Sequence, residues 1–265
     1  MCDSCGCPSP GSTSHSHGHE GHSHSHSHGH DHSTAPAGTR TVDVHASLFA
    51  ANDALAKINR DHFEEAGAVA LNLISSPGSG KTTLLEHTIE ALRGQIRIGV
   101  IEGDIETERD ADRIRAKGVP AVQLTTGGAC HLDAAMIHRG FHQLQKEKGG
   151  GDIDLLFIEN VGNLVCPATF DLGEHERVVL VSVPEGPDKP AKYPKAFTSS
   201  HTFLITKTDL LPYFDFPVAE AKREALHLNH HLRVIDLCAT KGGEGFAAWL
   251  DYLRELVGAM QAKRR

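Results

Sequence analysis

The 265-residue sequence lacks any run approaching the roughly 20 apolar residues that a membrane-spanning helix needs. Its N-terminal region also lacks the apolar core of a secretory signal peptide, so we expect a cytoplasmic protein without a membrane partner. An excess of basic residues is missing as well: 26 Lys and Arg stand against 34 Asp and Glu, which gives a net charge of −8. This balance argues against nucleic-acid binding, which relies on a basic face that releases phosphate counterions.

Aromatic residues are scarce, at 5% with a single tryptophan, whereas histidine occurs 20 times and cysteine six times. Three cysteines crowd into the first seven residues, and the others are scattered at Cys130, Cys166 and Cys238. Disulfide frameworks are typical of small secreted domains, and thiols in the cytosol stay reduced. We therefore interpret the cysteines as available metal ligands rather than as disulfide partners.

The histidines divide the chain in two. Nine of the 20 lie between His15 and His32, and the surrounding stretch from Pro8 to Arg40 has almost no apolar residue larger than alanine. Such a segment cannot bury enough surface to offset the entropy of ordering. We predict a disordered metal-binding tail over residues 1–40 and one α/β domain over residues 41–265.

The second part alternates between apolar strand-like runs and amphipathic helices, after a first helix predicted at 42–66. The other predicted helices are 82–93, 106–117, 132–148, 218–228 and 246–260. The predicted strands are 68–75, 96–102, 121–125, 154–159, 178–183, 201–206 and 234–237. Buried strands separated by helices indicate a mostly parallel sheet that is flanked by helices on both faces.

The strongest chemical signal is a Gly-rich turn between a buried strand and a helix. Its glycines permit backbone angles that point N–H groups at a phosphate, Lys81 supplies charge to the β- and γ-phosphates, and the Thr82 hydroxyl can hold Mg²⁺. The P-loop pattern G-x-x-x-x-G-K-S/T is met except at its first position, Ser75. The residues expected to bind the phosphates are Gly78, Ser79, Gly80, Lys81, Thr82 and Thr83.

Two later segments favour guanine as the base. The sequence TKTD, which includes Lys207 and Asp209, is close to the N-K-x-D motif, in which the Asp carboxylate accepts hydrogen bonds from the ring N–H and amine of guanine. Adenine offers neither donor in that geometry, so GTP is favoured over ATP. Lys207 would lie along the base. The later sequence CATK, with Ala239 and Thr240, resembles a loop that also contacts guanine.

Two carboxylates are expected at the same edge of the sheet. Glu159 ends a strand in the place of a Walker B acid, and Asp104 follows the strand after the P-loop helix. Together with Lys81 and Thr82 they form the predicted catalytic group, orienting Mg²⁺ or its waters, although ordinary polarity at strand ends is the alternative interpretation. No residue stands out as a catalytic base, so we expect slow hydrolysis of GTP to GDP and phosphate.

The tail offers two kinds of metal ligand. Cys2, Cys5 and Cys7 place three thiols on a flexible end, which suits Ni²⁺ and would also bind Zn²⁺, with an inert or redox-active cluster as the alternative. The histidine tract has no fixed geometry and favours several weakly bound ions, for storage or buffering. Its predicted ligands are His15, His17, His19, His22, His24, His26, His28, His30 and His32.

A third group of ligands lies inside the folded domain. Cys130 and His131 are adjacent at the predicted start of a helix, and Cys166 lies just past the strand that ends at Glu159. These ligands are too few to close a tetrahedral site, which a two-fold dimer would complete. The alternative is two buried structural cysteines and a histidine that caps the helix.

In these motifs the chain closely resembles the HypB family of GTPases, which insert nickel into [NiFe]-hydrogenase. The resemblance runs from about residue 42 to the C-terminus. It is carried by SSPGSGKTTLLE, IEGDIETERDADRIR, TTGGACHLDA, LFIENVGNLVCPATFDLGE, PEGPDKP at 184–190 and TKTDLLPY. ENVGNLVCP together with GGACHLDA is highly specific. The N-terminal CxxCGC and the histidine tract resemble family members that also bind or store nickel.

The resemblance implies a SIMIBI-type P-loop fold and a homodimer influenced by GTP and metal. It implies a metal site of Cys130, His131 and Cys166 near the interface, and phosphate and Mg²⁺ roles for Lys81 and Thr82 as well as Asp104. It also implies a HypA-type nickel metallochaperone as partner and the [NiFe]-hydrogenase large-subunit precursor as recipient. Our hypothesis is that the tail collects nickel and that GTP switches the shape around Cys166. A urease-type nickel GTPase and a nickel storage protein with a vestigial nucleotide site are the alternatives.

Overall fold

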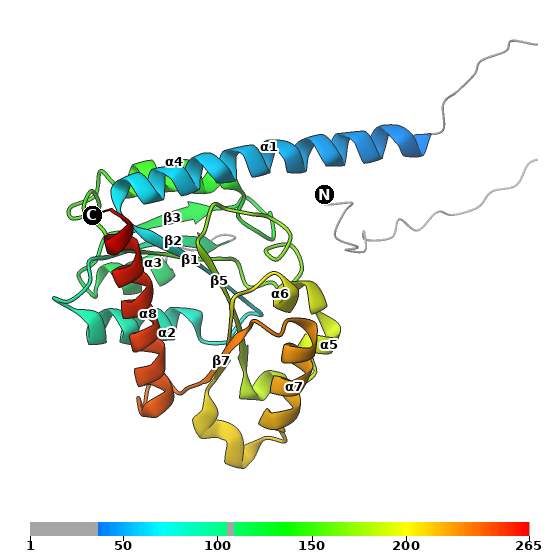
Figure 1. The fold of residues 1–265 in the computed structure, drawn as a ribbon, viewed down its shortest axis with the longest axis vertical. Coiled ribbons are helices and arrows are strands. Elements are labelled where there is room, and N and C mark those ends of the chain that lie inside the picture. Colours follow the sequence, from blue (N-terminus) through cyan, green and yellow to red (C-terminus); the bar gives the residue numbers. More distant parts are fainter. Residues whose placement is uncertain (1–36, 105–108, 265) are drawn as a thin grey trace, which may run out of the picture. The chain divides into compact units, whose positions relative to one another are not determined.

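The computed structural model describes residues 37–104 and 109–264 (Figure 1). Side chains are described from residue 46 onward. All seven predicted strands are present and form one sheet in the order β3-β2-β4-β1-β5-β6-β7, in which every neighbouring pair is parallel. The predicted P-loop NTPase fold class is thereby confirmed. The strands are β1 (Val69–Ser75), β2 (Ile98–Asp104), β3 (Ala121–Thr125), β4 (Leu155–Glu159), β5 (Glu176–Ser182), β6 (Thr202–Thr206) and β7 (Arg233–Asp236).

The helices lie where hydrophobic periodicity predicts them, with shifted ends. The first begins at Ala37 rather than at residue 42, and the fourth is shorter than the predicted span 132–148. Short helices between β5 and β6, and a 3-10 turn after β6, are additions to the prediction. The helices are α1 (Ala37–Ala66), α2 (Lys81–Leu92), α3 (Arg109–Arg115), α4 (Ala134–Leu144), η1 (Val183–Glu185), α5 (Lys189–Lys192), α6 (Pro194–Thr198), η2 (Thr208–Tyr213), α7 (Val218–Leu228) and α8 (Glu244–Lys263).

The chain divides into a unit of residues 1–48 and a unit of residues 49–265, and the second contains the whole sheet. Most of the predicted tail lies outside the described residues, so its boundary at residue 40 stays a prediction. Within 37–104 and 109–264, no helix combines the length and apolar character needed to cross a bilayer.

Alternating strand residues build the core on both faces of the sheet. On one face Phe157 packs with Trp249 of α8, in a cluster that also includes residues of α2. On the other face Leu156 packs with Phe63 of α1 and Phe141 of α4, whose rings meet edge to face at 4.8 Å between centroids. Because both faces are covered, the strands are apolar throughout. Such continuous apolar runs can be predicted as strands from the sequence.

The strand order also fixes where a ligand can bind. From β1 the chain crosses to β2 and β3 on one side, returns to β4, and then continues to β5 on the other side of β1. Ligands of such sheets bind beyond the carboxyl ends of the strands, where the order reverses. Ser75, Asp104 and Glu159 end their strands at this edge.

A buried ion pair holds the loop between β4 and β5. Arg177 and Glu174 are both buried, and Arg177 Nε donates to Glu174 Oε1 at 2.8 Å. The same guanidinium donates to the carbonyl oxygens of Ala168 at 3.1 Å and Phe170 at 2.8 Å. Removing one partner of such a pair leaves an uncompensated buried charge, so the loop depends on both.

Glu174→Ala should therefore lower the free energy of unfolding by about 3–5 kcal/mol, because it leaves the buried Arg177 guanidinium without a counter-charge. Urea denaturation of the purified chain measures this. The matched control is Asp61→Ala, which breaks an exposed pair with Lys57 and should cost less than about 1 kcal/mol. Equal losses in the two variants would contradict the argument.

Candidate functional site

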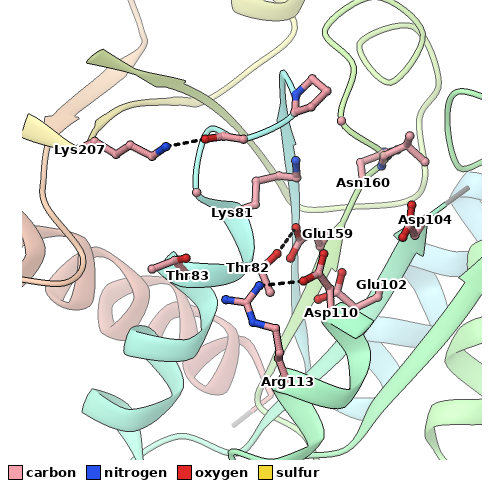
Figure 2. A pocket seen from close by; sticks show the side chains of 16 residues that line it. Lys81, Thr82, Thr83, Glu102, Asp104, Asp110, Arg113, Glu159, Asn160 and Lys207 are labelled. Carbon is pink, nitrogen blue, oxygen red and sulfur yellow. Dashed lines mark hydrogen bonds and ion pairs between the residues drawn. The ribbon is translucent and has the colours of Figure 1, made fainter. Parts of the chain in front are cut away.

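The P-loop forms at the carboxyl end of β1. That strand is buried along its whole length and ends at Ser75, and α2 begins at Lys81. Gly78 and Gly80 have φ angles of 76° and 95°, in the left-handed region that glycine adopts without strain. The N-terminus of α2 therefore faces a cavity of about 540 Å³, lined by Lys81, Thr82 and Thr83 among others (Figure 2).

Ser75 occupies the position where the P-loop pattern has glycine, and its hydroxyl forms hydrogen bonds with other residues of the loop. Its Oγ accepts hydrogen bonds from Lys81 Nζ at 2.8 Å and from Ser79 Oγ at 2.5 Å. It donates to the carbonyl oxygen of Ser76 at 2.7 Å. The serine thus supplies an acceptor for the buried Lys81 ammonium, which glycine could not do.

Two buried acidic residues meet beside Thr82. The register between β2 and β4 pairs Glu102 with Glu159, and Glu159 Oε1 accepts a hydrogen bond from Thr82 Oγ1 at 2.9 Å. Glu102 Oε1 and Glu159 Oε2 are buried without a hydrogen-bond partner among the described residues. The sequence argument identified Glu159 and overlooked Glu102, whose proximity to it depends on the order of the strands.

Burial changes the acidity of this pair. Loss of water raises the pKa of Glu102 well above its usual range, and the charge of Glu159 raises it further. Burial also raises the pKa of Glu159, while the Lys81 ammonium acts in the opposite direction. The two carboxyl groups therefore hold protons more strongly than exposed glutamates, and a bound cation would relieve their repulsion.

Asp104 lines the same cavity from the end of β2, and Figure 2 draws it apart from the glutamate pair. Asp110 and Arg113 of α3 complete this side, and sequence reasoning missed both. Arg113 Nη1 lies 2.8 Å from Asp110 Oδ1, and its Nη2 lies 2.6 Å from Glu86 Oε2 on α2. The arginine therefore links α3 to α2 at the cavity.

A second cavity, of about 270 Å³, contains the predicted base-binding residues. It is lined by Lys207, Asp209, Ala239 and Thr240, and it shares Gly80, Thr83 and Lys207 with the first cavity. The two cavities are thus neighbours on either side of the P-loop. This is the arrangement that a nucleotide with separate phosphate and base ends requires.

Asp209 is held in its ionised form. Its Oδ1 accepts a hydrogen bond from Cys238 Sγ at 3.2 Å, and its Oδ2 lies 3.4 Å from Lys241 Nζ. The Cys238 hydrogen bond contributes most, and Lys241 next, to holding the pKa of Asp209 below its usual range. A charged carboxylate at the cavity wall can accept hydrogen bonds from a base.

The base loop is tied to the P-loop by two hydrogen bonds. Thr206 Oγ1 donates to the carbonyl oxygen of Ser79 at 2.7 Å, and Lys207 Nζ donates to that of Gly78 at 2.7 Å. Lys207 has a φ of 57°, a left-handed conformation that no other non-glycine among the described residues adopts. Thr206, a departure from N-K-x-D, therefore joins the two loops through its hydroxyl.

The predicted metal ligands of the domain also meet. One ligand atom each from Cys130, His131 and Cys166 lie within 4.8 Å of one another. The two Sγ atoms are 3.0 Å apart, and neither cysteine forms a disulfide. His131 stacks on Phe170 at 4.0 Å between centroids, and burial lowers the pKa of His131, which favours the neutral imidazole that metals bind.

His131 is not a helix cap, which removes the histidine part of the alternative interpretation. α4 begins at Ala134 instead of residue 132, and its N-cap is Asp133, whose Oδ1 accepts a hydrogen bond from the Met136 N–H at 2.7 Å. Cys130 and His131 therefore lie in the loop before the helix, and their side chains lie close to that of Cys166.

Residues 160–166, which we call the connecting segment, run from the phosphate cavity to the thiol cluster. Asn160 Oδ1 accepts a hydrogen bond from the Leu132 N–H at 3.2 Å. A Cβ on Gly162 would lie 3.0 Å from Pro77 Cα, so the segment packs closely on the P-loop. Asn163 forms a β-bridge with Ser75 and donates from Nδ2 to the Cys130 carbonyl oxygen at 3.4 Å.

The predicted ligands of the tail lie outside the described residues and stay predictions. They are the three cysteines of the CxxCGC motif and the nine histidines from His15 to His32.

The sheet, the P-loop and the two adjoining cavities define a P-loop nucleotide-binding domain with a thiol–imidazole cluster beside it. Residues 69–236 match the family described as "CobW/HypB/UreG, nucleotide-binding domain". The hydrogenase maturation factor HypB of Azotobacter chroococcum is 51% identical over 83% of this chain and 71% of its own length. The chain belongs to the CobW/HypB/UreG family, and within it to the HypB hydrogenase maturation factors.

Two solved structures agree with this assignment. HypB from Helicobacter pylori, in complex with nickel, is 40% identical and has a TM-score of 0.75, covering 78% of this chain and 95% of its own. HypB from Archaeoglobus fulgidus is 42% identical with a TM-score of 0.72, covering 78% and 99%. The likeness therefore extends over almost all of both solved chains.

Glu102→Gln should flatten the dependence of stability on pH. The folded-state pKa of Glu102 lies above its ordinary value of 4.5, so the folded chain binds this proton more tightly than the unfolded chain does. The resulting stability is complete below pH 4.5 and is lost as the pH rises through the folded-state value. Urea denaturation in chelating buffer should show a steeper loss with rising pH for the wild type than for the variant.

The control for this experiment is Glu90→Gln. Contact with Lys117 lowers the pKa of Glu90, so that group gives stability that is present above pH 4.5 and lost as the pH falls. Its substitution should change the slope in the opposite sense. Equal slopes for the wild type and Glu102→Gln would contradict the raised pKa.

Proposed function

We propose that the chain is a GTP-hydrolysing nickel metallochaperone, which binds or stores nickel and delivers it during the maturation of [NiFe]-hydrogenase. The observation that carries this proposal is the connecting segment. It starts next to Glu159 in the phosphate cavity and ends at Cys166 in the thiol cluster. A protein that only stored metal would have no use for a nucleotide site on the other end of this segment.

The two cavities support GTP as the nucleotide. The loop amides and Lys81 would bind the phosphates, and the Asp209 carboxylate would accept hydrogen bonds from the ring N–H and amine of guanine. Lys207 lies between the cavities and is bonded to Gly78, so the base and the phosphates are bound by one connected unit. Ala239 and Thr240 would form the far wall against the base.

The oxygen atoms beside Thr82 fit Mg²⁺. The Thr82 hydroxyl, the unpartnered oxygens of Glu102 and Glu159, and Asp104 nearby are the hard ligands that this ion prefers. Bound there with GTP, Mg²⁺ would neutralise charge that develops on the phosphates. The described residues that line the cavity include no histidine to act as a base near neutral pH, and slow intrinsic turnover follows.

The thiol cluster fits nickel as cargo. Two thiols and an imidazole suit Ni²⁺, and the relative solved with nickel supports that choice, while Zn²⁺ would compete for the same ligands. Three ligands leave the coordination of the ion incomplete. A homodimer would bring equivalent residues across a two-fold axis and complete it.

Nucleotide state would change metal affinity through the connecting segment. Loss of the γ-phosphate changes what Lys81 and Glu159 contact, and Gly162 and Asn163 are packed on or bridged to the P-loop. Asn163 also holds the Cys130 backbone, so a shift of the P-loop reaches both cysteines. By linkage, nickel must then change nucleotide affinity by the same factor.

The tail and the partners complete the proposed pathway. Cys2, Cys5 and Cys7 and the histidine tract would collect nickel in the cytoplasm, where thiols remain reduced. A HypA-type metallochaperone and the large-subunit precursor of [NiFe]-hydrogenase would be the partners that exchange or receive it. The family relationship to hydrogenase maturation factors supports these partners.

Lys81→Ala should abolish hydrogenase activity in cells, because it removes the charge that binds the phosphates. A deletion of residues 8–36, which spares α1, should leave activity near normal when nickel is plentiful. Hydrogenase and urease activities are measured together in a strain that lacks its own copy of the gene.

Full hydrogenase activity in Lys81→Ala would contradict the proposal and leave a nickel storage protein. Restoration of urease but not of hydrogenase by the wild-type chain would contradict the hydrogenase assignment and favour the urease-type alternative.

Asp209→Asn should shift the base preference from GTP towards xanthosine triphosphate. Xanthine carries an oxygen where guanine carries its amine, so the amide N–H of Asn has an acceptor there, while guanine loses a charge-assisted hydrogen bond. We expect GTP affinity to fall by about 10- to 100-fold, in line with a hydrogen bond to a charged group. Competition binding between GTP and xanthosine triphosphate measures this. An unchanged GTP affinity would contradict the role of Asp209.

A further inference from the structure

Three histidines outside the nucleotide and thiol sites lie together between two helices. His62 comes from α1, and His138 and His142 come from α4. One ring nitrogen of each lies within 4.8 Å of the others. The ring centroids are 5.3 Å apart for His62 and His138, 5.4 Å for His62 and His142, and 4.6 Å for His138 and His142.

The spacing of the two α4 histidines places both on one face of the helix. Residues four apart on a helix are neighbours, so His138 and His142 can bind one ion together. His62 reaches the same point from the second helix. His62 and His138 are partly buried and His142 is exposed, so an ion could enter from solvent at His142.

A hydrogen bond to Asn59 fixes the tautomer of His138. The Asn59 amide nitrogen donates to the carbonyl oxygens of Ala134 at 2.8 Å and Leu172 at 3.0 Å, which sets the orientation of this buried side chain. Its Oδ1 lies 3.1 Å from His138 Nδ1 and can only accept. His138 therefore carries its proton on Nδ1 and keeps the Nε2 lone pair for a metal, as oriented metal-binding histidines do.

The other two histidines have matching features. His142 Nδ1 lies 3.2 Å from the Oε1 of Gln145, which leaves its Nε2 as the ligand atom in the same way. His62 Nδ1 is buried and has no hydrogen-bond partner among the described residues. Burying an unpaired polar nitrogen costs free energy, and an ion bound to that nitrogen would offset the cost.

We propose that His62, His138 and His142 form a second metal site of the folded domain, for a divalent first-row transition ion of the Ni²⁺ and Zn²⁺ class. Three imidazoles with solvent at the remaining position are a sufficient ligand set for these ions. The site would join α1 to α4 through the ion. It shares no ligand with the Cys130–His131–Cys166 cluster and does not depend on GTP.

The test uses the full chain. The labelling of each histidine is measured separately, so ions bound to the histidines of the tail do not interfere with the result for these three residues. Diethylpyrocarbonate modifies accessible unligated histidines, and peptide mass spectrometry locates the modification. In a titration with Ni²⁺, and in a parallel one with Zn²⁺, His62, His138 and His142 should become protected together. His230 and His231, which are exposed and adjacent to each other, should stay reactive at the same ion concentration.

Two variants sharpen the test. His142→Gln removes an exposed ligand and leaves the core intact, so it should raise the ion concentration that protects His62 and His138 by at least about tenfold. His231→Gln, the matched control, should not change it. Protection of His62 and His138 at the wild-type concentration in His142→Gln, or no protection by either ion in the wild type, would overturn the proposal.

Discussion

The register between β2 and β4 brings the carboxyl groups of Glu102 and Glu159 together at the buried edge of the sheet, with Lys81 as the nearby cation. Two carboxylates cannot share such a site without a proton or a cation, because desolvation and mutual repulsion both oppose their ionisation. The cavity around them therefore favours a proton or a bound cation. Phosphates bound at the P-loop would lie in the same place, so the proposed binding of a nucleotide and of a cation there would be coupled by the electrostatics of the fold.

The connecting segment extends that constraint to the thiol cluster. It begins where the glutamates meet, packs on the P-loop at Gly162 and holds the Cys130 backbone through Asn163. The Glu174–Arg177 pair fixes the loop beyond Cys166, because Arg177 also donates to the Ala168 carbonyl oxygen. A short segment with one end in each site, and with its far side anchored, gives a physical route by which hydrolysis of a phosphate bond could change how a metal is held.

Most of the fold could be predicted from the sequence, because strands buried on both faces read as apolar runs and the P-loop and TKTD motifs have fixed spacings. Glu102, Asp110 and Arg113 could not, since their place in the site depends on which strands and helices become neighbours. Cys130, His131 and Cys166 were predicted from their residue types, but the loop position of His131 follows from the cap at Asp133. The His62–His138–His142 group is similar: the spacing on α4 is visible in the sequence, and the approach of α1 is not.

The most direct test of the coupling is the nickel affinity of the Cys130–His131–Cys166 cluster, measured by competition with a chromophoric chelator in a chain that lacks residues 1–36. The measurement is made once with GDP and once with a non-hydrolysable GTP analogue. The account predicts affinities that differ by at least about fivefold, the lower end of typical coupling between sites. It also predicts a smaller difference in Asn163→Ala. The same nickel affinity in both nucleotide states would contradict it.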